Sequence, residues 1–250
     1  MQPYLALVRR ELGSLFKSWI AYVILAAVML LLGVSFVFLL RALNMESTPV
    51  PLTLLFYDTF FFWIILLLVT PLITMRTLAL EKSTGTFETL MTTPVHDAQV
   101  VLAKFTGALL FFLVLWLPLL PCLLIVRRFS SDPTALMPGA IAATYLGILL
   151  LGSVYLALGL FASALTRSQI VAAVVAYALG IPLFCLSFLG AMLPSQSGLL
   201  RQAVAHVAWM EHMSQFAQGL VDLRPVVLCL SLTALFLYLT LKAVGARRWR

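Results

Sequence analysis

Histidine and acidic side chains carry out much of the acid–base chemistry and metal binding of proteins, and in this chain they stand apart. The three histidines are His96, His206 and His212, all in segments that we predict to be loops. His206 and His212, with Glu211 between them, are six residues apart, a spacing that does not place both imidazoles on one face of a helix. The pattern therefore favours neither a metal site nor a catalytic cluster.

Two further kinds of chemistry are disfavoured. Cys122, Cys185 and Cys229 lie within or near apolar runs and share no close spacing, which argues against a metal cluster and a disulfide framework. The sequence also contains no G-x-x-x-x-G-K-[ST] phosphate loop, so the chain does not cradle ATP in that manner. We predict a chain that is not an enzyme and holds no cofactor or metal itself.

The composition indicates a membrane protein. Of the residues, 63% are hydrophobic and 10% are charged, with a mean hydropathy of +1.09. Soluble domains carry about 25% charged residues. Most of this chain is therefore expected to lie in lipid.

Six charge-free runs predict six membrane spans. They are residues 18–40, 59–75, 105–126, 133–166, 168–200 and 225–241. A helix needs about 20 residues to cross the hydrocarbon core, so the second and sixth runs must recruit flanking residues. Because the runs lack the alternation of barrel strands, we predict an all-α membrane protein with six transmembrane helices, forming a single domain over residues 1–250.

The distribution of Lys and Arg predicts the orientation. With six spans both termini lie on one side, and that side receives eleven basic residues against five on the other. The eleven are Arg9, Arg10, Lys17, Arg76, Lys82, Lys104, Arg167, Lys242, Arg247, Arg248 and Arg250. Basic residues are enriched in cytoplasmic loops, so both termini are predicted to be cytoplasmic. Basic residues that flank spans also explain the net charge of +7 without a nucleic-acid partner.

An amphipathic helix is predicted before the first span. Apolar residues from Tyr4 to Phe16 recur every three or four positions, while Arg9, Arg10 and Glu11 take other positions. We expect this helix to lie along the cytoplasmic leaflet.

Two charged residues lie near the ends of predicted spans. Asp58 is the one carboxylate expected inside a span, and intramembrane ionisable residues are candidate functional sites. Asp58 lies near the outer end, however, so capping or snorkelling at the interface is the favoured explanation. Lys104, near the cytoplasmic start of the third span, is expected to snorkel toward water.

Several prolines and polar residues are expected to shape the spans, either as kinks or as packing adjustments. Pro118 and Pro121 in the third span, and Gly180 with Pro182 in the fifth, permit kinks. Residues 166–168 predict a tight turn that makes the fourth and fifth spans antiparallel. In residues 194–224 we expect short amphipathic helices at the outer leaflet.

That last segment also carries capping signals. Ser195 or Ser197 is a candidate helix cap, and Gly219 is expected to end a turn. Asp222 or Leu223 is expected near the start of the last span, with Pro225 in its first turn.

A polar island, residues 76–104, separates the second and third spans. Within it Thr84 or Thr86 can cap a short helix, Glu88 falls in the first turn, and Pro94 ends it. This crosswise helix would display Phe87, Leu90 and Met91, and Asp97 is expected to cap the third span.

The run from Glu81 to Val95, EKSTGTFETLMTTPV, resembles the pattern E-x-x-x-G-T-x-E-x-L-x-x-x-P-V of permease subunits of the ABC-2 class of ABC transporters. The N-terminal RRELGSLFKSWIAYV, with Trp19 where these permeases commonly have proline, and the end LSLTALFLYLTLKAVGARRWR resemble the same class, closest to the gliding-motility-type permeases.

The resemblance implies a permease subunit in the bacterial inner membrane that catalyses no reaction of its own. It implies that a separate ATP-binding subunit, which holds the ATP and Mg, drives this permease. It also implies a second permease subunit, the same or different. The implied contacts to the ATPase partner are Glu81, Gly85, Thr86, Phe87, Glu88, Leu90, Met91 and Pro94, and Arg9, Arg10 and Glu11 belong to the amphipathic helix before the first span.

We therefore expect a transporter subunit, most simply an exporter. The alternative is a secondary transporter or channel that works alone. That reading would need intramembrane charges or internal repeats, for which Asp58 is the one candidate.

Overall fold

The structure, a computed structural model, describes residues 2–45, 53–54, 56, 60–86, 96–129, 138–192 and 208–246. Within these ranges all regular structure is helical. The helices are α1 (Gln2–Phe16), α2 (Trp19–Met45), α4 (Phe60–Thr74), α5 (Ala79–Thr84), α7 (Asp97–Trp116), α8 (Leu119–Phe129), α9 (Pro138–Leu165), α10 (Gln169–Met192), α12 (Trp209–Ala217) and α13 (Leu223–Gly245).

Six helical segments of the described chain are long and apolar enough to cross a membrane. They are Trp19–Arg41, Phe60–Thr84, Asp97–Val126, Pro138–Leu165, Gln169–Ser187 and Leu223–Gly245. Each corresponds to one predicted span, which confirms the predicted fold class.

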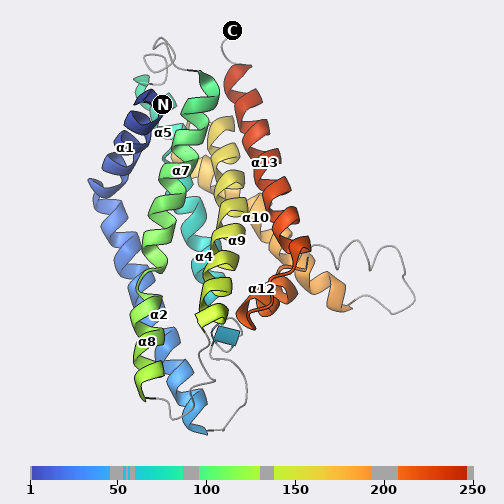
Figure 1. Ribbon diagram of the computed structural model, residues 1–250. Helices are drawn as coiled ribbons and strands as arrows, with labels where there is room; N and C mark the ends of the chain where they lie inside the picture. Colours follow the sequence, from blue (N-terminus) through green and yellow to red (C-terminus); the bar gives the residue numbers. More distant parts are fainter. Residues whose placement is uncertain are drawn as a thin grey trace.

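Helix α9 lies at the centre of the bundle and contacts α4, α7, α10, α12 and α13 (Figure 1). Two of its glycines allow this. A Cβ added at Gly152 would lie 2.2 Å from the ring of Phe112, and one added at Gly159 would lie 2.1 Å from Oγ1 of Thr74. Small residues let membrane helices approach closely, so these two glycines allow α7 and α4 to pack directly against α9.

Both termini lie at one end of the bundle, which also carries α5 and the first turns of α7 (Figure 1). Helices α8 and α12 lie at the opposite end (Figure 1). The candidate functional residues of α1, α5 and α7 therefore share one end of the molecule.

The third span is interrupted at its prolines, whereas the helix of the fifth span continues through Pro182. Helix α7 ends at Trp116, and α8 begins after Pro118, with Pro121 in its first turns. Pro182, in contrast, lies inside α10, which continues to Met192. The predicted turn of residues 166–168 joins α9 to α10.

Most of the predicted features before the last span are confirmed. Gly219 has a φ of 84°, in the left-handed region that glycine favours. Asp222 is the N-cap of α13 and accepts a hydrogen bond from the backbone N–H of Arg224. Pro225 follows in the first turn, and α12 supplies a short amphipathic helix. Ser195 and Ser197 lie outside the described residues.

The start of the third span differs from the prediction by one residue. The N-cap position is His96, with φ −70° and ψ 140°, and Asp97 is the first residue of α7. Asp97 therefore contributes as an acid in the first turn, where the helix dipole favours negative charge, and not from the N-cap position.

Candidate functional site

The residues proposed to meet a partner fall into two groups. Glu81 lies in α5, and Gly85 and Thr86 follow it directly. Phe87, Glu88, Leu90, Met91 and Pro94 lie outside the described residues, as does Asp58. Arg9, Arg10 and Glu11 lie in α1.

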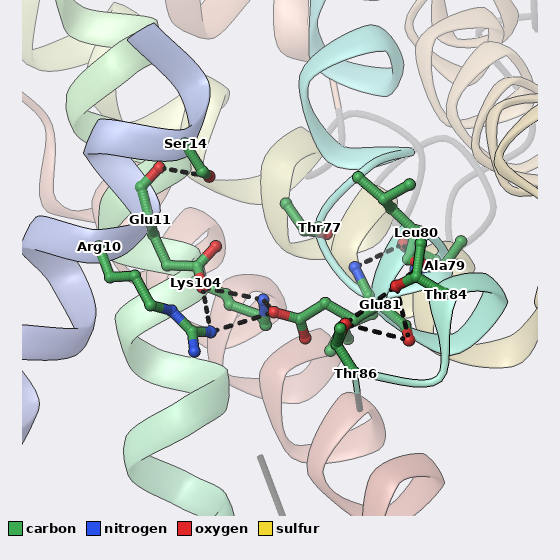
Figure 2. Close-up of polar contacts among 12 residues, drawn as sticks. Arg10, Glu11, Ser14, Thr77, Ala79, Leu80, Glu81, Thr84, Thr86 and Lys104 are labelled. Carbon is green, nitrogen blue, oxygen red and sulfur yellow. Dashed lines mark hydrogen bonds and ion pairs between the residues drawn. The ribbon is translucent and has the colours of Figure 1, made fainter. Parts of the chain in front are cut away.

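Glu81 and Glu11 meet at a cluster of four charged side chains from three helices. Lys104 Nζ lies 2.7 Å from Glu81 Oε1 and 3.0 Å from Glu11 Oε1. Arg10 Nη2 lies 3.0 Å from the same oxygen of Glu11 and 3.1 Å from the same oxygen of Glu81. Figure 2 shows Arg10, Glu11 and Lys104 converging with Glu81. We call Arg10, Glu11, Glu81 and Lys104 the ion-pair cluster.

The ion-pair cluster forms a closed circuit in which positive and negative groups alternate. Each carboxylate uses one oxygen to bind both cations, so that the four groups balance in formal charge. The exposed fraction of the side chain is 1% for Lys104, 11% for Glu11 and 17% for Glu81, against 50% for Arg10. Most of the cluster is thus shielded from water and salt.

The prediction that Lys104 snorkels to water is wrong. Its side chain is buried because α1 and α5 cover it and bring their carboxylates to it. A buried cation is tolerated only when paired. The sequence did hold one signal, which is that the acids Glu11 and Glu81 are expected at the same membrane face as Lys104.

Helix α1 reaches Lys104 because it lies against α7. A Cβ added at Gly107 would lie 3.0 Å from Cβ of Glu11, so glycine at this position permits the close approach. Two other contacts hold the helices together. The hydroxyl of Tyr4 donates to Oγ1 of Thr106 at 3.1 Å, and the rings of Phe16 and Phe111 meet edge to face.

The neighbouring arginines of α1 behave differently. Arg10 joins the ion-pair cluster, whereas Arg9 is exposed and makes no ion pair with a described residue. Only part of the N-terminal group predicted from sequence is thus brought to Glu81.

Helix α5 is fixed from its other side by α9. The backbone N–H groups of Leu78 and Ala79 both donate to Oγ of Ser163, at 3.1 and 2.9 Å. These groups begin α5 and have no partner within the helix, so Ser163 acts as a cap supplied by another helix. Lys82 Nζ donates to the carbonyl oxygen of Ala164, one residue further along α9.

Helix α5 ends where the resemblance places a glycine. Gly85 stands at its C-cap position with φ 75°, in the left-handed region. Glu81, Lys82 and Gly85 therefore fix where the chain leaves α5 toward residues 87–95.

The described residues hold no group of three His, Cys, Asp or Glu side chains able to bind a metal ion. The polar groups of α5 bind polar groups of neighbouring helices instead, and these contacts join the helices.

The helices define a multi-pass membrane protein, and the ion pairs among its described residues lie at one end of the bundle. A family model described as ABC-2 family transporter protein matches residues 52–237 of the 250, so the chain belongs to that family. No curated protein matches the chain. Membership makes it a permease subunit, the non-catalytic membrane component of an ABC transporter, and implies association with an ABC ATPase subunit.

Proposed function

We propose that this chain is a permease subunit of a bacterial exporter of the gliding-motility type, and that the segment from Glu81 to Pro94 receives the movement of the ATPase subunit. The observation that carries the proposal is the position of Glu81. It lies at the start of the segment for which the resemblance implies contact with the ATPase partner, and it forms ion pairs with two other helices of the bundle. A push on this segment therefore has a direct route into the spans.

The proposed roles follow from position. Gly85 sets the direction of the chain after α5, and Thr86 opens the segment that contains Phe87, Glu88, Leu90, Met91 and Pro94. The apolar side chains of this segment would contact the ATPase subunit, and Glu88 would orient that contact. ATP and Mg would be held by the partner, whose closure on ATP drives the movement.

The proposed orientation places α5 and both termini in the cytoplasm of a bacterial cell, at the inner membrane. Support comes from charge, because eleven of the 16 basic residues fall on that side in the predicted topology. An ATPase subunit working from the cytoplasm would then meet α5 directly. The substrate path would form between this chain and a second permease subunit, which is either a second copy or a different chain.

The test is co-purification in detergent of the tagged native chain and a Glu88→Arg variant. We expect an ATPase subunit to co-purify with the native chain and to be depleted with Glu88→Arg. The control is Glu211→Arg, because Glu211 is an exposed acid on α12 at the other end of the bundle (Figure 1). A folded native chain that recovers no ATPase subunit would instead support a transporter or channel that works alone.

A second variant separates binding from coupling. Gly85→Ala places a side chain at φ 75°, a conformation that costs roughly 1–2 kcal/mol for residues other than glycine. We expect it to redirect the segment and lower transport per ATP hydrolysed while membrane insertion stays normal. Full transport by Gly85→Ala and Glu88→Arg, with normal partner binding, would show that the coupling assignment is wrong.

A further inference from the structure

Helix α1 lies outside the residues that match the family, which begin at residue 52. It is nevertheless bound to the segment that starts at Glu81, through side chains and not through the course of the backbone. Arg10 bonds Glu81 directly, and Glu11 shares Lys104 with it.

The geometry of the ion-pair cluster links the positions of its members. Oε1 of Glu81 takes both of that residue's ion pairs, while its buried Oε2 has no hydrogen-bond partner in the described part of the chain. Because one oxygen makes both contacts, any displacement of Glu81 acts on Arg10 of α1 and on Lys104 of α7 at once. Since both cations also bind Glu11, that displacement is transmitted to α1.

The rest of the interface keeps α1 in register with α7. The contacts of Tyr4 with Thr106 and of Phe16 with Phe111 flank the ion-pair cluster on both sides along α1. Gly107 allows the two helices to touch between them. Helix α1 is thus held along much of its length, with the cluster as its connection to α5.

We propose that Lys104 and Glu11 are positioning residues for coupling, which make α1 move with α5 when the ATPase partner acts. This inference rests on the proposed function, because it assumes that the partner acts on the segment after Glu81. According to this inference, the amphipathic helix α1 itself takes part in transmitting the movement of the ATPase partner. Neither residue needs to touch the partner.

The first experiment measures how strongly the chain stimulates the ATPase rate of the subunit that co-purifies with it. Lys104→Met removes the shared cation, and Glu11→Gln keeps the shape of the side chain but removes its charge. We expect either change to lower stimulation on the order of tenfold while the ATPase subunit still co-purifies. Lys17→Met is the matched control, because Lys17 is exposed near the end of α1, and it should match the native chain.

Charge exchange distinguishes a closed circuit from a simple pair. Combining Lys104→Glu with Glu81→Lys restores an isolated pair, but it places two bases together at positions 10 and 81 and two acids together at positions 11 and 104. We expect this double variant to stay uncoupled. Adding Arg10→Glu and Glu11→Lys restores the alternation and should recover part of the stimulation.

A distance measurement tests the movement itself and covers variants whose activity is lost. Spin labels at Ser14→Cys and Ser83→Cys, both exposed sites, report the separation of α1 and α5 in a chain whose native cysteines are replaced by alanine. With the complex intact, we expect nearly the same distance without nucleotide and with ATP and vanadate. In Lys104→Met the distance should shift or its distribution broaden.

The outcomes separate the two proposals. If the native chain binds and stimulates an ATPase subunit but Lys104→Met and Glu11→Gln remain fully coupled, the positioning role is wrong and the permease function stands. If the double exchange restores coupling, the pair of residues 81 and 104 is sufficient, and the proposed role of Glu11 and α1 is wrong. If the label distance changes with nucleotide in the native complex as much as in Lys104→Met, α1 does not move with α5. If the native chain binds no ATPase subunit, both proposals fail.

Discussion

The ammonium group of Lys104 lies 2.7 Å from the carboxylate of Glu81, and only 1% of the lysine side chain is exposed. The two residues come from different helices, α7 and α5, on either side of residues 87–95. Their contact joins the two helices that precede and follow those residues in the chain. A charge buried to this degree makes the local structure depend on its partners.

Removal of Lys104 is expected to destabilise the protein. Lys104→Met keeps an unbranched chain of similar length but leaves Glu11 and Glu81 facing each other with only the half-exposed Arg10 between them. Breaking a buried ion pair on one side costs about 3–5 kcal/mol. Thermal unfolding in detergent should show a clear loss, whereas Lys17→Met, at an exposed site, should unfold as the native chain does.

A double variant checks the cause of that loss. Adding Glu81→Gln to Lys104→Met removes one of the two carboxylates that lost their cation, so part of the stability should return. If the double variant were less stable by the sum of the two single losses, the pairing would not be the source of the effect.

The hydroxyl of Ser163 is expected to protect the start of α5. It accepts hydrogen bonds from the N–H groups of Leu78 and Ala79, and loss of a helix cap costs about 1 kcal/mol. In Ser163→Ala these two amides should exchange with deuterium roughly fivefold faster, because local opening becomes easier by that amount. Ser231→Ala is the control, since Ser231 is exposed and bonds a carbonyl of its own helix. Unchanged exchange at both amides would contradict the capping role.

Most of the fold can be predicted from the composition and from the helix periodicity. The six spans follow from runs without charge, and the turn at residues 166–168 from its polar residues between two such runs. The N-cap at Asp222 and the left-handed Gly219 are equally local, because each depends on a few neighbouring residues. Such features need no knowledge of which helices touch.

The candidate site was only partly predictable, because it depends on contacts between distant segments. The sequence pointed to Glu81 and Glu11 separately, through a resemblance to other permeases. It gave Lys104 the wrong environment, since a lysine near the end of a span normally reaches water. Only the packing of α1 on α7 at Gly107, together with the position of α5, shows that Lys104 is enclosed.

The effect of a proline on its helix is likewise not predictable from the sequence alone. Pro118 ends a helix and Pro182 does not, although both lie in apolar spans. A proline leaves one carbonyl without its helical partner, and whether the helix stops there depends on the surroundings.

Gly159 is expected to be intolerant of a side chain. A Cβ at this position of α9 would lie 2.1 Å from Oγ1 of Thr74, which is buried at the end of α4. Overpacking of this kind costs typically about 1–3 kcal/mol, so Gly159→Ala should lower the temperature of thermal unfolding. Gly33→Ala, where a Cβ would meet nothing within 4 Å, should not. Thr74→Ala should partly rescue Gly159→Ala, and equal losses with and without it would exclude the clash with Thr74 as the cause.

Trp209 is expected to hold α12 against the bundle. Its backbone N–H donates to Oγ of Ser187 at 3.0 Å and its indole N–H to the carbonyl oxygen of Leu183 at 3.1 Å, so that one residue binds α12 to α10 twice. Trp209→Phe keeps an aromatic ring but loses the indole donor, worth about 1 kcal/mol. Amides of residues 209–217 should then exchange with deuterium a few times faster.

The control for this change is a tryptophan that is exposed and far from α12. Trp19 is 87% exposed at the start of α2, so Trp19→Phe should leave exchange in α12 unaltered. The two variants remove the same atoms, and only their surroundings differ. Because the indole of Trp209 bonds α10 while its backbone bonds a side chain there, Ser187→Ala should add to the effect of Trp209→Phe. If Trp209→Phe and Trp19→Phe gave identical exchange, α12 would be held by the packing of Met213 and Phe216 against Gly147 instead.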